Sequence, residues 1–171
     1  MSGSVLKRIT LSGLLLALSV SAVAAQARTI VPDLKKIDIL IRTTIVALNH
    51  ANRTGNYTVF RDLGSPNFGN ANTAARLAAI FATLRKQNLD LGPVILFNPQ
   101  LTRQPTLDQQ SRLRLTGFFP TRPLQVNFDL AYELIAGQWR LFGIAVNATS
   151  PPSAKAAPAR KPVKPKAKKK R

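Results

Sequence analysis

The first half of the chain places its large apolar residues at helical spacing. Separations of three and four positions put side chains on one face of a helix. The residues that recur in this way are Leu34, Ile37, Ile41, Ile45 and Leu48. Pro32 and Asp33 suit the first turn, because proline fits the first helical position and an acidic side chain complements the helix dipole. Gly55 suits the position after the last turn, so a helix is predicted from about residue 32 to residue 54.

Two shorter helices are predicted before residue 87. The first covers residues 57–63 and ends where Gly64, Ser65 and Pro66 interrupt the pattern. After a loop through residues 67–71, Asn72 or Thr73 caps the second, whose last turn holds two basic residues. The apolar face of this second short helix consists of Leu77, Ile80, Phe81 and Leu84.

The second half of the chain alternates apolar and polar residues, which is the period of a strand. A short strand is predicted at residues 94–97, a longer one at 112–119 and the longest at 124–134. A turn at residues 136–137 then leads into a last strand over residues 138–147. One face of the longest strand carries Leu124, Val126, Phe128, Leu130, Tyr132 and Leu134.

The two-residue turn sets the register of the last two strands. The opposite charges of Glu133 and Arg140 agree with the register that this turn implies. The expected pairs are Leu134 with Trp139, Tyr132 with Leu141 and Leu130 with Gly143 on one face, and Glu133 with Arg140 and Ala131 with Phe142 on the other. Helices followed by a strand meander predict an α+β domain, with the N-terminal helices packed on one face of an antiparallel sheet.

This order of elements, with a last strand that carries Trp139 between Gln138 and Val146, resembles the nuclear transport factor 2-like superfamily over residues 32–148. The resemblance implies a curved, cone-like sheet that wraps around the first helix and encloses a pocket. The superfamily includes isomerase-like and dehydratase-like enzymes as well as domains that have a pocket but no known reaction. The short strand that often separates the helices has no counterpart here. The residues expected to line the pocket are Tyr57, Phe128, Tyr132 and Trp139.

Both ends of the chain differ from the middle. Lys7 and Arg8 precede an uncharged run over residues 9–25, and the small residues Ala25 and Ala27 follow, which predicts a signal peptide over residues 1–27 that is cut before Arg28. The alternative is an uncleaved membrane anchor, but the run is interrupted by serine and glycine and falls short of about 20 apolar residues. The expected location is the periplasm or the medium, and one domain is predicted over residues 28–150.

Residues 151–171 predict a disordered basic tail rich in lysine, proline and alanine. Val163 is its only large apolar residue, so the segment cannot bury enough surface to offset the entropy of ordering. The chain carries a net charge of +18, and nine of its 25 basic residues lie in this tail. They are Lys155, Arg160, Lys161, Lys164, Lys166, Lys168, Lys169, Lys170 and Arg171.

An exported cationic tail indicates an anionic membrane surface or an acidic envelope polymer as its partner. Export disfavours nucleic acid, although the tail's composition alone would suit it. The alternative is a tail that serves only solubility. The chain has no cysteine, which excludes acylation on cysteine, disulfides and cysteine metal sites.

The remaining chemistry-bearing residues predict no catalytic, metal or cofactor site. His50 is the only histidine, and beside Asn49 it is expected to be a solvated surface residue. Asp129 and Glu133 share a strand face directed away from the pocket. With Arg140 opposite Glu133, a structural ion pair across the strands is favoured over an acid and base pair.

Two functions from different classes remain. The first is a non-catalytic accessory or small-ligand-binding domain, with an apolar ligand in its pocket and the tail on the envelope. The second is a pocket enzyme of the isomerase or dehydratase type. Phe142, Ile144 and Val146 form an apolar row on the expected outer face of the last strand, which favours a homodimer through the sheet. The alternative is a strand buried on both faces within one chain.

Overall fold

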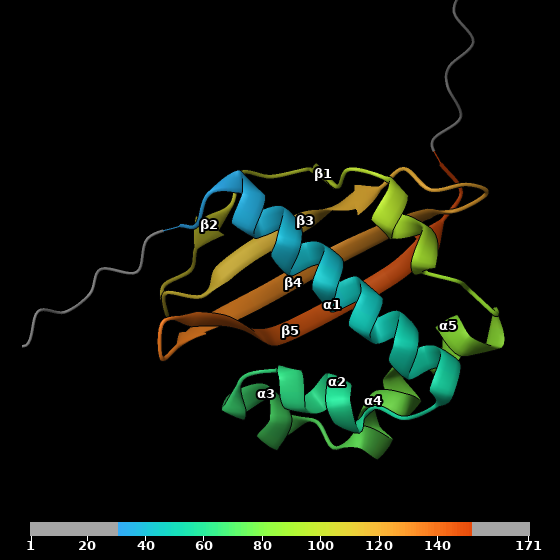
Figure 1. Cartoon of the computed structure of the whole chain (residues 1–171), viewed down its shortest axis with the longest axis horizontal. Coiled ribbons are helices and arrows are strands. Elements are labelled where there is room, and N and C mark those ends of the chain that lie inside the picture. Colours follow the sequence, from blue (N-terminus) through green and yellow to red (C-terminus); the bar gives the residue numbers. More distant parts are fainter. Residues whose placement is uncertain (1–30, 152–171) are drawn as a thin grey trace, which may run out of the picture.

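The computed structural model describes residues 31–151 and confirms an α+β fold, with helices preceding a five-stranded antiparallel sheet (Figure 1). The elements in chain order are α1 (Leu34–Thr54), α2 (Thr58–Leu63), α3 (Pro66–Ala71), α4 (Ala74–Ile80), α5 (Ala82–Lys86), the 3-10 helix η1 (Gly92–Leu96), β1 (Gln100–Leu101), β2 (Thr106–Leu107), β3 (Leu113–Phe119), β4 (Gln125–Ile135) and β5 (Gln138–Thr149). The expected signal peptide and nearly all of the basic tail lie outside the described residues.

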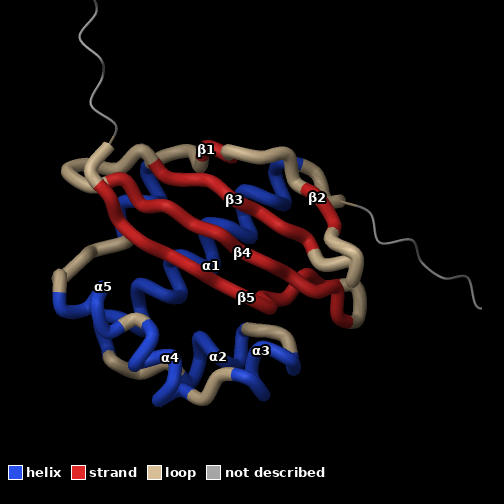
Figure 2. The backbone as a smooth tube through the Cα atoms, turned by 180° about the vertical axis from the view of Figure 1, so that it is seen from behind, coloured by secondary structure: helices blue, strands red, loops and turns tan. Residues whose placement is uncertain are grey.

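Helix α1 crosses one face of the sheet diagonally, while α2, α3 and α4 lie beyond the edge formed by β5 (Figures 1 and 2). Seen from behind in Figure 2, the other face of the sheet has no helix of residues 31–151 over it. The core therefore lies between α1 and the sheet and continues into the group of short helices. It includes Ile41, Leu48, Phe60, Leu77 and Leu130, all buried.

The predicted first helix is confirmed, with small changes at its start. Asp33 is its N-cap, and the Asp33 carboxylate accepts a hydrogen bond of 2.7 Å from the Lys36 N–H. Pro32 therefore precedes the cap and does not lie in the first turn. Leu34 is 72% exposed, so the buried face begins at Ile37. Gly55 adopts φ of 71°, the left-handed conformation that favours glycine after a helix.

The predicted third helix is two helices, because the chain breaks at Phe81. Phe81 leaves the helical conformation (φ −93°, ψ 11°) and buries its ring against Tyr57, with the two ring centroids 6.2 Å apart. Thr73 caps α4, as one of the two expected caps. The break turns Ile80 outward, so its expected place on the apolar face is wrong.

Helix α3 was expected to be a loop. Its local signals are nevertheless present, because Ser65 caps the Phe68 N–H at 3.2 Å and Pro66 occupies the first turn. Phe68 is buried against Phe60 with the rings perpendicular, which holds this short helix on the core.

The expected strand at residues 94–97 is wrong, because this segment forms η1. Pro93 fits the first turn of a helix, and Arg42 binds two carbonyl oxygens of the turn, those of Val94 at 2.9 Å and Ile95 at 3.0 Å. The edge strand is instead β1, which pairs with Gly117 and Phe118 of β3. A run of apolar residues cannot by itself distinguish these two outcomes.

The sheet has the order β1-β3-β4-β5, with β2 also on β3. The predicted strands at 112–119 and 124–134 are confirmed as β3 and β4, and Ala136 and Gly137 form the turn with positive φ. Near the turn the expected register is correct: Leu134 pairs with Trp139, Tyr132 with Leu141 and Glu133 with Arg140.

Beyond Leu141 the expected register is wrong by one residue, because a bulge inserts Phe142 into β5. Ala131 therefore pairs with Gly143, and Leu130 pairs with Ile144. A bulge shifts every later side chain to the other face of the strand. Ile144 and Val146 consequently pack against the core.

The bulge removes the apolar row on which the expected homodimer rested. Of its three residues, only Phe142 is left outside the core, and its ring lies beneath the Arg112 guanidinium, with Cζ 4.5 Å from the ring centroid. The alternative of a strand buried on both faces within one chain is also wrong, because Leu141 is the only fully buried residue of β5.

Candidate functional site

A small apolar cleft of about 150 Å³ lies between α1, α2 and the hairpin of β4 and β5. Its lining residues are Leu40, Thr43, Thr44, Ala47, Phe60, Leu63, Tyr132, Trp139 and Leu141. Two of the four residues expected to line a pocket, Tyr132 and Trp139, are brought together here. Apolar side chains make up most of the lining, which suits an apolar ligand.

Tyr132 reaches the cleft from β4 and is buried. Its hydroxyl donates to the Leu40 carbonyl oxygen at 2.9 Å and lies 2.8 Å from the Thr44 hydroxyl. Since the single phenolic proton is used on Leu40, the Thr44 hydroxyl donates to Tyr132. Burial raises the pKa of Tyr132 above its ordinary value, and the hydrogen bond from Thr44 only partly opposes this. The phenol is therefore neutral at physiological pH.

The other threonine of the cleft, Thr43, donates its proton within α1 itself. The Thr43 hydroxyl donates to the Ile39 carbonyl oxygen at 2.7 Å. The protons of all three hydroxyl groups around the cleft are therefore donated within the protein. Toward a ligand, these groups can act only as hydrogen-bond acceptors, through the lone pairs of their oxygens. This arrangement suits an apolar molecule or the apolar part of a larger one.

Trp139 reaches the cleft from β5, directly opposite Leu134. It is the only tryptophan of the chain. Leu63 lies in the last turn of α2 and is exposed, so it forms part of the rim. The cleft therefore contains the chain's single tryptophan, whose emission can report on its occupancy.

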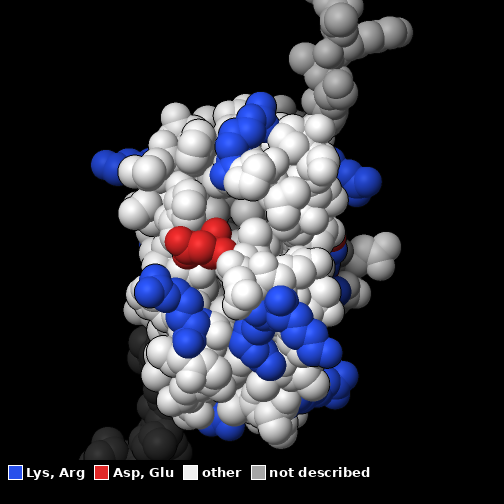
Figure 3. Space-filling model, turned by 90° about the vertical axis from the view of Figure 1, so that its right-hand side faces the viewer, with Lys and Arg blue, Asp and Glu red and all other residues white. Residues whose placement is uncertain are grey.

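Tyr57 does not line this cleft. Its hydroxyl accepts a hydrogen bond of 2.6 Å from Arg85 Nη1 and donates to Asn52 Oδ1. Both partners line a separate hollow of about 470 Å³ between the end of α1 and the segment after α5. The Asn52 Nδ2 is buried and makes no hydrogen bond. Figure 3 shows basic side chains gathered on the lower part of this side of the molecule.

Phe128 lines neither cavity. Its ring packs on Phe119 with the centroids 5.6 Å apart, in the core beneath α1. The alternation along β4 predicts that Phe128 points inward. It does, but its ring packs against other core residues and does not line a cavity.

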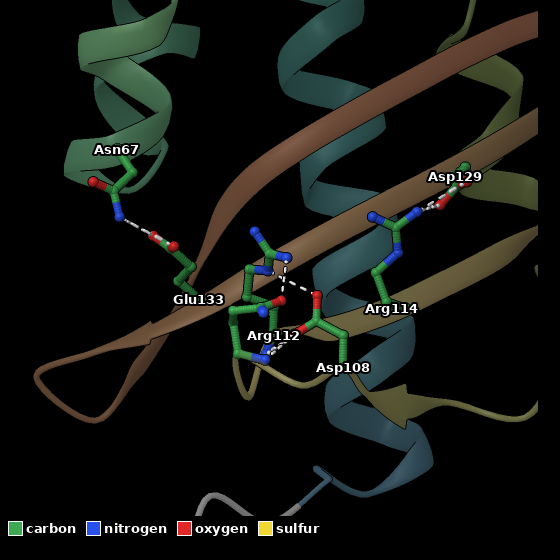
Figure 4. Close-up of polar contacts among 7 residues, drawn as sticks. Asn67, Asp108, Arg112, Arg114, Asp129 and Glu133 are labelled. Carbon is green, nitrogen blue, oxygen red and sulfur yellow. Dashed lines mark hydrogen bonds and ion pairs between the residues drawn. The ribbon is translucent and has the colours of Figure 1, made fainter.

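The two carboxylates that share a face of β4 are held by different partners (Figure 4). Asp129 pairs with Arg114 of β3 at 3.1 Å, and Glu133 accepts from the Asn67 amide at 3.1 Å. The expected ion pair between Glu133 and Arg140 is wrong, although the register that suggested it is correct. Arg140 instead donates to the Asp62 carbonyl oxygen at 2.6 Å.

Sequence reasoning missed a further carboxylate, Asp108, in the loop before β3. It accepts from Arg112 Nε at 2.7 Å and from the Gln110 N–H at 2.9 Å (Figure 4). Burial would raise the pKa of Asp108, but the hydrogen bonds from Arg112 and Gln110 outweigh this and lower it. An aspartate two residues before its backbone donor is a turn signal that the sequence contained.

His50 is exposed on α1, as expected, and its backbone carbonyl accepts from Thr54. Within residues 31–151, no group of three histidine, cysteine or acidic residues is placed to hold a metal ion. In the same part of the chain no helix has the length and apolar character needed to cross a membrane.

Comparison of the chain with models of known families, with curated proteins and with solved structures found no match.

Proposed function

We propose that the protein is an exported, non-catalytic accessory domain that binds a small apolar ligand and is held on anionic envelope material by its basic tail. The observation that carries the ligand-binding part is the cleft around Tyr132 and Trp139. It combines apolar walls with hydroxyl oxygens whose protons are already donated within the protein.

The volume of the cleft limits what it accepts. Ligand pockets commonly measure about 300–1,000 Å³, whereas this cleft measures about 150 Å³. An apolar cavity of roughly 150 Å³ holds a molecule the size of benzene. The ligand, or the part of it that enters, is therefore a single ring or a short aliphatic chain.

An isomerase or dehydratase of the same shape would need a proton-transferring group at its pocket. The described lining of the cleft provides hydroxyls, while Asp129 and Glu133 are bound by Arg114 and Asn67 elsewhere. We therefore favour binding over catalysis. The nuclear transport factor 2-like resemblance belongs to the same proposal, and the order of its elements, helices before a strand meander, is what supports it.

The proposed attachment of the basic tail to the envelope, which we call the tether, rests on the composition of the tail. Each basic residue near an anionic surface contributes about 1 kcal/mol, an attraction that falls off within a Debye length. Nine such charges in residues 155–171 are enough to hold a protein of this size at low salt.

Fluorescence of Trp139 tests the ligand site. Titration with toluene or 1-hexanol is expected to change its emission saturably, because the ring lines the cleft. Ala47→Leu, which fills the cleft from α1, is expected to abolish the change. Ala75→Leu, at an exposed position of α4, is the matched control and is expected to respond like the unaltered protein.

Circular dichroism confirms that both variants are folded before the titration. Equal responses of Ala47→Leu and Ala75→Leu would contradict binding at this cleft. Isomerisation or dehydration of a bound ligand would favour the enzyme instead.

A further inference from the structure

The 3-10 helix η1 presents two large apolar side chains to solvent. Ile95 is 61% exposed and Leu96 is 79% exposed, which makes Leu96 the most exposed large apolar residue of the part that the structure describes. Single exposed apolar residues are ordinary on protein surfaces. Two adjacent ones at the tip of a turn form a small apolar protrusion, which we call the η1 tip.

The η1 tip is held firmly from below. Val94 is fully buried against the core. Arg42 of α1 donates to the carbonyl oxygens of Val94 and Ile95, and its Nη2 donates to the Asn98 side chain at 2.9 Å. Asp38 fixes the same guanidinium at 2.9 Å.

These contacts matter for the environment that the tip can enter. A backbone carbonyl without a partner is costly in a medium that offers no hydrogen bonds. The carbonyls of Val94 and Ile95 already accept from Arg42, so the Ile95 and Leu96 side chains can enter an apolar phase without exposing those two groups to it.

The η1 tip and the C-terminal end of the described chain lie at the same end of the sheet. β1, which follows η1 closely, begins at Gln100 opposite Phe118 near the end of β3, and Thr149 of β5 pairs with Gln125 at the start of β4. Figures 1 and 2 both show η1 close to the point where the described chain ends. The nine basic residues begin at Lys155, only four positions beyond Pro151.

We propose that the η1 tip inserts Ile95 and Leu96 into the surface of an anionic lipid membrane while the basic tail binds the headgroups. The inference rests on the proposed tether and selects lipid over acidic polymer as its partner. An acidic polymer in water offers charge but no apolar interior. Binding to it would therefore leave the exposed apolar side chains of the η1 tip unburied. Stable peripheral anchoring commonly needs two signals, of which a basic segment is one.

The two signals respond differently to salt, and this makes the inference testable. Attraction between the tail and headgroups is screened as the ionic strength rises, whereas burial of Ile95 and Leu96 is not. The protein is expected to keep measurable affinity for vesicles of phosphatidylglycerol and phosphatidylethanolamine at 0.5 M salt (~3–5 Å screening length).

The test compares Ile95→Ser/Leu96→Ser with Val59→Ser/Ile80→Ser. The control removes two apolar residues of similar exposure, 67% and 51%, from α2 and α4, away from η1. Vesicle co-sedimentation is done with protein freed of residues 1–27, since their apolar run would itself bind lipid. At high salt the η1 variant is expected to bind at least about ten-fold more weakly than the control, from the burial of two aliphatic side chains.

Two further arms separate this inference from the tether. If deletion of residues 152–171 abolishes binding at low salt and the η1 variant binds like the control at every salt concentration, the tether stands and insertion of the tip is refuted. Equal affinity for soluble polyphosphate and for vesicles would also refute it, in favour of an acidic polymer. If the intact protein fails to bind vesicles even at low salt, the proposed tether is itself wrong.

Discussion

At the scale of single residues, Tyr132 connects the sheet to α1 and to the cleft. Its hydroxyl donates to Leu40 and accepts from Thr44, both in the helix. A buried hydroxyl that satisfies two partners contributes on the order of 1 kcal/mol, and leaving its partners unsatisfied costs more. Tyr132 is therefore both a wall of the candidate site and a polar link across the core.

Tyr132→Phe is expected to lower the free energy of unfolding by about 1–2 kcal/mol at pH 7, because the Thr44 hydroxyl loses its acceptor. Urea denaturation with a fluorescence readout measures this. A change in the free energy of unfolding below a few tenths of a kcal/mol would mean that these hydrogen bonds do not stabilise the fold.

The same residue makes stability depend on alkaline pH. Burial raises the folded pKa of Tyr132 above the unfolded value, which is about 10. The unfolded chain therefore loses this proton first, so the contribution is fully present below about pH 10 and declines as the pH rises beyond it. Tyr132→Phe is expected to flatten the fall in stability between about pH 10 and 11.5. An identical fall in the variant would contradict the assignment.

At the scale of elements, the edge of the sheet depends on the absence of a side chain at Gly117. A Cβ built there would lie 2.2 Å from the Gln100 carbonyl oxygen of β1 and 2.9 Å from the Phe128 ring. The close approach of the short strand β1 to β3 therefore requires glycine, for reasons of space and not of backbone conformation.

Gly117→Ala is expected to destabilise the protein by about 1–3 kcal/mol, as overpacking does. Gly143→Ala is the matched control on the same sheet, because a Cβ there would meet only Ala131 at an ordinary 3.7 Å. Its effect is expected to stay within about 0.5 kcal/mol. Thermal unfolding of both variants tests this, and equal losses would contradict the close approach of β1.

At the scale of the whole molecule, charge and fold are divided between different parts of the chain. The seven acidic residues all lie between residues 33 and 133, whereas nine basic residues lie in the last 21 positions. Four of the seven acids form ion pairs with arginines of the folded part, namely Asp38 with Arg42, Asp62 with Arg61, Asp108 with Arg112 and Asp129 with Arg114. The domain is therefore expected to be stable without either end of the chain.

Protein recovered from cells is expected to begin at Arg28, which N-terminal sequencing checks, and an intact Met1 would contradict cleavage.

Deleting residues 152–171 from this protein is expected to leave the melting temperature unchanged within about 1–2 °C, because a segment so rich in lysine and proline adds no core contacts. A larger loss would show that the tail supports the fold.

The sequence by itself determined the features that depend on neighbouring residues. The face of α1 from Ile37 to Leu48 follows from spacing, the left-handed Gly55 from the cap, and the turn at Ala136 and Gly137 from local backbone preference. The register of the last hairpin follows from that turn for as long as the strands stay regular.

Only the tertiary structure decided the features that depend on distant residues. The bulge at Phe142 reverses the faces of Ile144 and Val146, the guanidinium of Arg42 supports a 3-10 turn in place of a strand, and the cleft exists because α1, α2 and the hairpin bring Tyr132 and Trp139 together. Two of these outcomes depend on hydrogen bonds between residues far apart in the sequence. Arg42 and Val94 are 52 positions apart, and Thr44 and Tyr132 are 88 positions apart. Periodicity reports which side chains are apolar, and packing decides what they touch.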